Sequence, residues 1–340
     1  MTYLKHQRFL DIVEQMTKSG QILVVGDIGI DKYTFGEVKR ISPEAPVPVL
    51  EVSKEWLKLG LASNISHNLE TLGIKSTLLG VVGSDSNADV LEGLLEEVGL
   101  STWGIVRDAG RKTTFKERVT TDIQQVCRID YETSQDLSPE TQAKVLDRFH
   151  EFLSHHQSII LEDYSKGLLS DVMLQKMIAL GKKQNVLVAV DPYRTKDARS
   201  YRGCHLLKPN LIECKLLVNS LGKREGKIEE MAKILLGELE LEMIAVTLGP
   251  QGMFVADRKG MAKIVPTVAT EVYDVSGAGD TSISVLTAAL MAGAKLDEAA
   301  FVANCAAGVV VGKKGTAIVT SEELVSFFEN VSRRKTPNQN

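Results

Sequence analysis

The chain has 340 residues, and its 44% hydrophobic and 25% charged residues are ordinary for a globular protein. The net charge of -4 gives no general attraction to nucleic acid or anionic membranes, so a basic site for an anionic ligand must be local. No apolar run reaches the roughly 20 residues that a membrane-spanning helix needs. The scattered cysteines contain no CxxC pair, which favours reduced thiols in a cytoplasmic protein. The histidines lack metal-ligand spacing, and His155-His156 is expected at the surface.

Short apolar runs alternate with stretches of helical periodicity along most of the chain. Residues 1–20 predict an amphipathic helix rather than a signal peptide. Strands are predicted at 21–26, 76–82, 158–161, 186–190, 204–208 and 243–248. Helices are predicted at 62–72, 88–98, 169–182, 228–239 and 282–292. The alternation indicates a mostly parallel sheet with helices on both faces.

Two segments interrupt this alternation. Residues 32–52 carry three prolines and lack a helical period, and residues 113–131 alternate β-branched and polar side chains. Both predict antiparallel strands, and both follow strands of the main sheet, where an open α/β sheet holds its ligand. We therefore expect a single domain over 1–340 with a small β lid, built from insertions at about 32–55 and 111–132. The polar tail at 332–340 is expected to be flexible.

The run Asp274-Val275-Ser276-Gly277-Ala278-Gly279-Asp280-Thr281 is the most informative segment. Its small residues allow backbone N–H groups to converge on an anion, and the helix that follows adds the positive end of its dipole. Asp280 would repel phosphate there unless its carboxylate takes part in the chemistry. Removing a proton from an attacking hydroxyl during phosphoryl transfer is such a part. A glycine turn with an aspartate N-cap is the alternative.

Further motifs lie in order along the chain. They are Gly26-Asp27 with Asp31, Gly60-Leu61-Ala62-Ser63-Asn64, Asn210-Leu211-Ile212-Glu213, Thr247-Leu248-Gly249-Pro250-Gln251-Gly252 and Asn304-Cys305-Ala306-Ala307-Gly308. Together with the 274–281 run they resemble the ribokinase-type (PfkB) carbohydrate kinases over nearly the whole chain. The resemblance implies a ribokinase-like three-layer α/β/α fold with a β lid. It also implies transfer of a phosphoryl group from ATP to a sugar hydroxyl, with Mg²⁺ as cofactor.

Four segments carry a narrower resemblance. They are 26–33 with Gly36 and 40–49, Gln124-Gln125 with Arg128-Ile129-Asp130, Asp163-Tyr164-Ser165-Lys166-Gly167, and Gly312-Lys313-Lys314-Gly315-Thr316-Ala317. They are similar to the branch that phosphorylates D-glycero-β-D-manno-heptose 7-phosphate at C1, which implies a role in ADP-heptose synthesis for the lipopolysaccharide core. Many relatives fuse this kinase to a C-terminal nucleotidyltransferase, an activity that we expect elsewhere here. A same-fold kinase of another sugar, sugar phosphate or nucleoside, and a catalytically silent nucleotide-binding relative, stay open as alternatives.

The resemblance also implies roles for single residues. Asp280 becomes the general base, beside an anion hole formed by Gly277, Ala278 and Gly279. Substrate would be bound by Asp27, Asp31, Arg40, Gly60, Asn64, Arg118 and Lys166, with Lys39 and Lys116 as further lid cations. A structural role at the end of its strand is the alternative for Asp27. ATP would be bound by Lys208, Asn210, Glu213, Thr247, Gly249, Gly252 and Asn304. Glu213 would hold Mg²⁺ through water, and Asp274 would seat a monovalent cation such as K⁺.

Three residues depart from the family pattern. Leu61 replaces the second glycine of the GGxxN turn, and Glu162 stands where a small residue is expected. Tyr193 stands where the heptose branch commonly has lysine. None of them lies in the 274–281 run, so they bear on the sugar more than on kinase activity. Because an isolated β lid exposes strand edges, we also expect a homodimer that pairs two lids.

Overall fold

The computed structural model describes residues 3–121, 123–269, 272–313 and 317–334. Within them, nine strands form one sheet in the order β13-β12-β11-β10-β9-β8-β1-β4-β5. Their bounds are β1 (Ile22–Gly26), β4 (Ser76–Val82), β5 (Ile105–Arg107), β8 (Ser158–Glu162), β9 (Leu187–Asp191), β10 (Leu206–Leu207), β11 (Met243–Thr247), β12 (Met253–Asp257) and β13 (Ala262–Val265). All neighbours from β5 to β11 are parallel, and β12 and β13 extend the sheet antiparallel.

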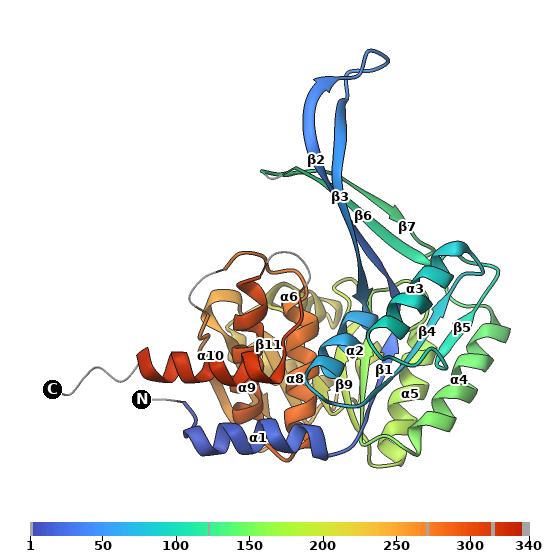
Figure 1. The fold of residues 1–340 in the computed structure, drawn as a ribbon. Helices are drawn as coiled ribbons and strands as arrows, with labels where there is room; N and C mark the ends of the chain where they lie inside the picture. Colours follow the sequence, from blue (N-terminus) through green and yellow to red (C-terminus); the bar gives the residue numbers. More distant parts are fainter. Residues whose placement is uncertain (1–2, 122, 270–271, 314–316, 335–340) are drawn as a thin grey trace.

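Helices cover both faces of this sheet (Figure 1). One face carries α1 (His6–Lys18), α2 (Ala62–Thr71), α3 (Ser86–Glu97), α8 (Ala278–Met291), α9 (Leu296–Val311) and α10 (Ser321–Arg334). The other carries α4 (Pro139–Leu153), α5 (Asp171–Lys183), α6 (Leu211–Ser220) and α7 (Ile228–Glu238). Within β1, Val24 packs into the first core while Leu23 and Val25 pack into the second, because successive strand residues face opposite sides. The predicted three-layer arrangement with a mostly parallel sheet is confirmed.

A second sheet of four strands, within the described residues, rises from the first (Figure 1). Its order is β3 (Pro48–Leu61), β2 (Ile28–Ile41), β6 (Thr114–Thr120) and β7 (Gln125–Tyr131). The sequence predicted antiparallel strands, and each hairpin is antiparallel, but β2 and β6 join the hairpins as a parallel pair. The β2–β3 hairpin projects well beyond β6 and β7. This sheet is the lid.

Several boundaries differ from the expectations. Helix α8 begins at Ala278, four residues earlier than the apolar run suggested, so the small residues of the anion hole lie in its first turn. Residues 332–334, expected in a flexible tail, belong to α10, while 335–340 lie outside the described residues, as does 314–316 of the motif that begins at Gly312.

The expectation for His156 was wrong. Its side chain is buried, with Nε2 2.9 Å from Thr77 Oγ1 and Nδ1 2.6 Å from the Phe152 carbonyl oxygen. No helix in the described part of the chain is both long and apolar enough to cross a membrane.

Candidate functional site

The candidate site lies where parallel strands of the central sheet end. Glu162 is the last residue of β8, Asp191 the last of β9, and Thr247 the last of β11, while Lys208 follows β10 by one residue. Neighbouring parallel strands present their carboxyl ends at one edge, so these side chains gather there. The N-terminus of α8 comes to the same edge, because the amine nitrogen of Lys208 would lie 3.9 Å from a Cβ built on Gly279.

The small residues predicted to form an anion hole lie at the N-cap and in the first turn of α8. Gly277 is the N-cap and has φ of 81°, a left-handed conformation that glycine adopts without strain. The N–H of Ala278 is engaged, since it donates to the Val275 carbonyl oxygen at 3.2 Å. The first-turn donors of Gly279 and Asp280, the helix dipole and the ammonium group of Lys208 all favour an anion at this position.

Asp280 is 9% exposed and hydrogen-bonded at both carboxylate oxygens. The Nδ2 of Asn64 donates to Oδ2 at 2.7 Å, and the Tyr164 hydroxyl donates to Oδ1 at 3.0 Å. Burial raises the pKa of Asp280 to about 6, with a further rise from the charge of Asp191 and opposing effects from the bonds of Asn64 and Tyr164. A carboxylate with a pKa near 6 is ionised at neutral pH and basic enough to accept a proton.

Three further carboxylates surround Lys208. Its ammonium group lies 2.7 Å from Asp191 in a buried ion pair. Burial raises the pKa of Glu162 well above its ordinary value, and the charges of Asp191 and Asp280 raise it further. Among the described residues, Oε2 of Glu162 is buried without a hydrogen-bond partner. Burial followed by the charge of Asp191 also raises the pKa of Glu213. Such a cluster of acids with one lysine favours a bound cation.

The NxxE motif forms the N-terminus of α6. Asn210 is the N-cap, and its side chain accepts from the Glu213 N–H at 2.9 Å, while Glu213 Oε2 accepts from the Asn210 N–H at 2.7 Å. This reciprocal capping box orients the Glu213 carboxylate beside Asp191.

A cavity of about 460 Å³ opens beside the α8 N-terminus. It brings together four predicted ATP residues with two of the anion hole, namely Thr247, Gly249, Gly252, Asn304, Ala278 and Gly279. Gly252 has φ of 99°, and a Cβ there would meet the Val265 carbonyl oxygen at 2.2 Å, so the turn requires glycine. The Asn304 amide donates to the carbonyls of Val265 and Pro266 at 2.9 and 3.2 Å. The volume is in the ordinary range for a small-molecule site.

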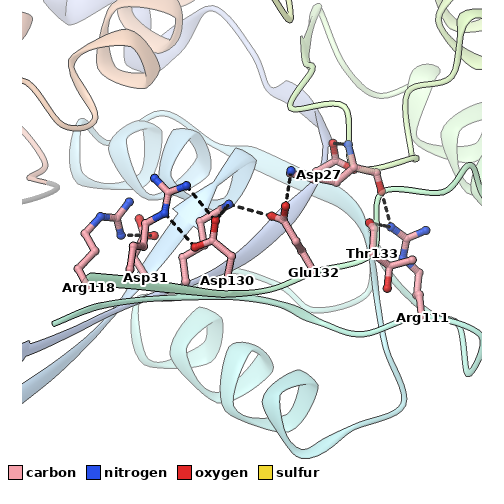
Figure 2. Close-up of polar contacts among 10 residues, drawn as sticks. Asp27, Asp31, Arg111, Arg118, Asp130, Glu132 and Thr133 are labelled. Carbon is pink, nitrogen blue, oxygen red and sulfur yellow. Dashed lines mark hydrogen bonds and ion pairs between the residues drawn. The ribbon is translucent and has the colours of Figure 1, made fainter. Parts of the chain in front are cut away.

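The lid turns a row of charged side chains toward the body (Figure 2). Arg118 Nη1 lies 2.6 Å from Asp31 Oδ1, and a Cβ on Gly60 would meet the Asp31 carboxyl group at 3.0 Å. Farther along, Glu132 lies between two lysines, 2.9 Å from Lys116 and 2.6 Å from Lys166. These side chains are paired with one another in the free protein.

A second cavity, of about 250 Å³, lies between the lid and the segment before α8. Its lining includes Tyr33, Lys58 and Arg118 of the lid with Asp274 and Ser276. Asp274 Oδ1 accepts from the Ser276 N–H at 2.9 Å. Among the described residues, no group of three or more histidine, cysteine or carboxylate side chains is arranged to bind a metal directly.

Of two further predicted substrate residues, Asp27 belongs to the set of contacts in Figure 2, through its bond from the Lys166 N–H, and Arg40 lies away from it. Asp27 is 4% exposed, and its carboxylate accepts from the N–H groups of Lys166 at 2.8 Å and Leu168 at 3.3 Å. Arg40 is exposed on the projecting part of the β2–β3 hairpin, opposite Val49. Lys39 beside it is also exposed and pairs with Glu37 and Glu51.

The sequence reasoning missed Tyr164, Asp191 and Lys58 and treated Glu162 only as a departure. A usable signal was present, since Glu162 and Asp191 directly end buried apolar strands of the predicted parallel sheet, where ligands bind. Leu61 keeps the glycine-like backbone of the turn that it occupies, with φ of 57°.

The chain matches the family model described as pfkB family carbohydrate kinase over residues 21–323. Two curated relatives, each named bifunctional protein HldE, come from Aliarcobacter butzleri and Nitratiruptor sp.. They are 40% identical over 318 residues and 41% identical over 319 residues, in both cases 94% of this chain. The chain spans 66% and 67% of the length of these two proteins, about two thirds.

Solved structures share the fold. Ribokinase from Thermotoga maritima aligns with a TM-score of 0.75 at 21% identity, covering 92% of this chain and 100% of that one. Phosphofructokinase-2 from Escherichia coli in complex with potassium aligns with a TM-score of 0.75 at 19% identity and the same coverage. With a family model that matches most of its length and relatives about 40% identical, this chain belongs to the pfkB family of carbohydrate kinases.

Proposed function

We propose that the chain is an ATP-dependent kinase that phosphorylates C1 of D-glycero-β-D-manno-heptose 7-phosphate, giving the 1,7-bisphosphate for ADP-heptose synthesis. The observation that carries the kinase reaction is Asp280, a buried carboxylate with a pKa of about 6 in the first turn of α8, next to Lys208. The heptose phosphate is supported by the HldE relatives and by the segments at 26–49, 124–130 and 163–167.

In this proposal Asp280 takes the proton of the sugar hydroxyl as its oxygen attacks the γ-phosphorus of ATP. The first-turn N–H groups of α8 and the Lys208 ammonium stabilise the charge on the transferred group. General-base catalysis of this kind contributes about 10²- to 10⁴-fold to the rate.

ATP would occupy the cavity of about 460 Å³, with its phosphates toward the α8 N-terminus. The carboxylate cluster fits Mg²⁺, because the unpartnered buried Oε2 of Glu162 and the raised pKa values of Asp191 and Glu213 are what a cation and its waters would relieve. Bound Mg²⁺ would neutralise charge on the ATP phosphates. We further propose that Asp274 seats a monovalent cation, since phosphofructokinase-2 of the same fold was solved with potassium.

On the lid side, Asp31 and Asn64 would hydrogen-bond sugar hydroxyls, with Gly60 leaving room for the Asp31 carboxyl group. Arg118 and Lys166 would bind the distal phosphate, exchanging their present carboxylate partners for it. Asp27 would act by holding the backbone from which Lys166 extends.

We also propose a homodimer that pairs two lids. The projecting hairpin exposes Val38, Ile41, Val47 and Val52, between 40% and 61% exposed. Apolar side chains on an unsupported hairpin are better buried against a second lid. Because Arg40 lies on this hairpin, its proposed contact with substrate depends on the pairing.

The test is ATP consumption with Mg²⁺ on the heptose 7-phosphate, fructose 6-phosphate, ribose and adenosine, with Asp280→Asn in parallel. Turnover of the heptose phosphate alone, lost in the variant, is the expected result. A preference for another sugar would reject the heptose assignment, and Leu61, buried with its strained backbone at the lid base, would then be the first residue to examine. No turnover of any of the four would favour a catalytically silent relative.

A further inference from the structure

The carboxylate of Asp280 is held from two sides of the site. Asn64, in the first turn of α2, donates to Oδ2 at 2.7 Å. Tyr164, in the segment that follows β8, donates to Oδ1 at 3.0 Å. Asn64 belongs to the GGxxN turn, whereas the motif analysis gave Tyr164 no role. One hydrogen bond on each oxygen stops the carboxylate from turning about its Cβ–Cγ bond.

Two buried carboxylates, those of Asp163 and Asp27, hold the backbone of residues 163–168 around Tyr164 through hydrogen bonds. Asp163 accepts from the Ser165 N–H and from the Tyr201 hydroxyl, each at 2.8 Å, and pairs with Lys196 at 3.1 Å. Ser165 is thereby held at φ of 55°, a left-handed conformation that is unfavourable for serine.

On the other side, Asp27 accepts from the N–H groups of Lys166 and Leu168. Gly167 between them has φ of 100°, and a Cβ there would meet the Gln135 carbonyl oxygen at 2.0 Å. Burying two carboxylates and straining one backbone position are costly. Both buried carboxylates and the strained backbone position are nevertheless present in this segment. The side chain that the segment directs at Asp280 is Tyr164.

We propose that Tyr164 is a positioning residue for phosphoryl transfer, a role that rests on the proposed kinase function. Each carboxylate oxygen has two acceptor sites, so the bonds from Tyr164 and Asn64 leave others for the sugar hydroxyl. The hydroxyl proton passes to Asp280, the sugar oxygen bonds to the γ-phosphorus, and the bond from that phosphorus to the ADP oxygen breaks. Tyr164 keeps its own proton and fixes the orientation in which Asp280 receives one.

The test is Tyr164→Phe, which removes the hydroxyl and retains the ring. Because misplacing a reacting group is costly in rate, kcat should fall at least about tenfold while KM for the sugar phosphate stays within about threefold. Thr141→Val is the matched control. It removes another partly buried hydroxyl–carboxylate hydrogen bond, from Thr141 of α4 to Asp108 at 2.8 Å, and Asp108 keeps its bond from the Gly110 N–H. It should lower the melting temperature similarly and keep kcat within about twofold.

A double-mutant cycle separates positioning from general damage. If Tyr164 acts through Asp280, then Tyr164→Phe should change the residual rate of Asp280→Asn by less than twofold. Three results would overturn the inference: unchanged kcat, an equal kcat loss in Thr141→Val, or a loss confined to KM. A wild-type protein inactive on every sugar would reject the proposed function and the inference with it. An active wild type with a normal Tyr164→Phe variant would reject the inference alone.

Discussion

Asp280→Asn should make the protein more stable at neutral pH while removing its activity. The wild-type carboxylate is buried, and burial raises its pKa to about 6. Asparagine has nearly the same shape and no charge. Its carbonyl oxygen can accept from Asn64, and its amide can donate to the Tyr164 oxygen once that hydroxyl rotates, so both neighbours stay satisfied.

The size of the gain follows from proton linkage. An aspartate whose pKa is about 6 when folded and about 3.9 when unfolded lowers the unfolding free energy by about 3 kcal/mol at pH 7.5. Between those two pKa values the folded state binds the proton first, so the loss shrinks as the pH falls and disappears below about pH 3.9. We expect Asp280→Asn to raise the unfolding free energy by about 2–3 kcal/mol at pH 7.5 and by about half of that at pH 5.0.

Urea unfolding of both proteins at pH 7.5 and pH 5.0 measures this difference. Asp27→Asn is the matched control, because burial also raises the pKa of Asp27 to about 6. Both oxygens of Asp27 accept from backbone N–H groups, which, unlike a hydroxyl, can only donate. One N–H would therefore face the amide of the new asparagine, at a cost of about 1–3 kcal/mol that offsets the gain.

The reasoning is refuted if Asp280→Asn is no more stable than wild type at pH 7.5, or if its advantage is the same at pH 5.0. A similar gain in the unfolding free energy of Asp27→Asn would show that loss of the buried charge alone accounts for the effect. The ability of the Tyr164 hydroxyl to act as an acceptor would then make no difference.

Three further outcomes are expected. The pH dependence of kcat/KM should rise through an apparent pKa of about 6, because Asp280 must be ionised to accept a proton, and a profile flat down to pH 5 would contradict this. Lys208→Met should lose about 3–5 kcal/mol in urea unfolding at pH 7.5, because it leaves buried carboxylates unpaired, whereas Lys215→Met, at a partly exposed ion pair with Glu225, should lose less than about 1 kcal/mol. Burial lowers the pKa of His156, so it is neutral when folded and stability should fall as the pH drops below about 6.5; His156→Gln, compared by urea unfolding at pH 7.5 and 5.5, should weaken that fall.

The sequence alone predicted those parts of the fold and of the site that depend on a local pattern of residues. Short apolar runs between helical stretches predicted β1, β4 and β8 to β11 of the main sheet, and β4 occupies 76–82 as expected, whereas β5, β12 and β13 were not predicted. The small residues of 277–279 predicted a helix N-terminus suited to an anion, and four predicted ATP residues do line one cavity with that turn.

Pairing between distant segments was not predictable. Residues 32–52 and 113–131 each indicated strands, but no local pattern gives the parallel pairing of β2 with β6. The family resemblance of Gly26-Asp27 implied a contact with sugar, with a structural role at the strand end as the alternative. Only the path of 163–168 shows that backbone N–H groups take both carboxylate oxygens of Asp27.

The buried carboxylates of the site lie close together, and their charges explain what the site can bind. Glu162 and Asp191, at the ends of adjacent strands, lie near Glu213 of α6 and Asp280 of α8, with Lys208 as their buried cation. Burial opposes the charge of each acid, so the free protein is less stable than one with neutral side chains there. A cation or a proton would relieve part of that cost, and the proposed reaction brings both Mg²⁺ and the sugar proton to the cluster. The same raised pKa that destabilises the free protein is what makes Asp280 basic enough to act.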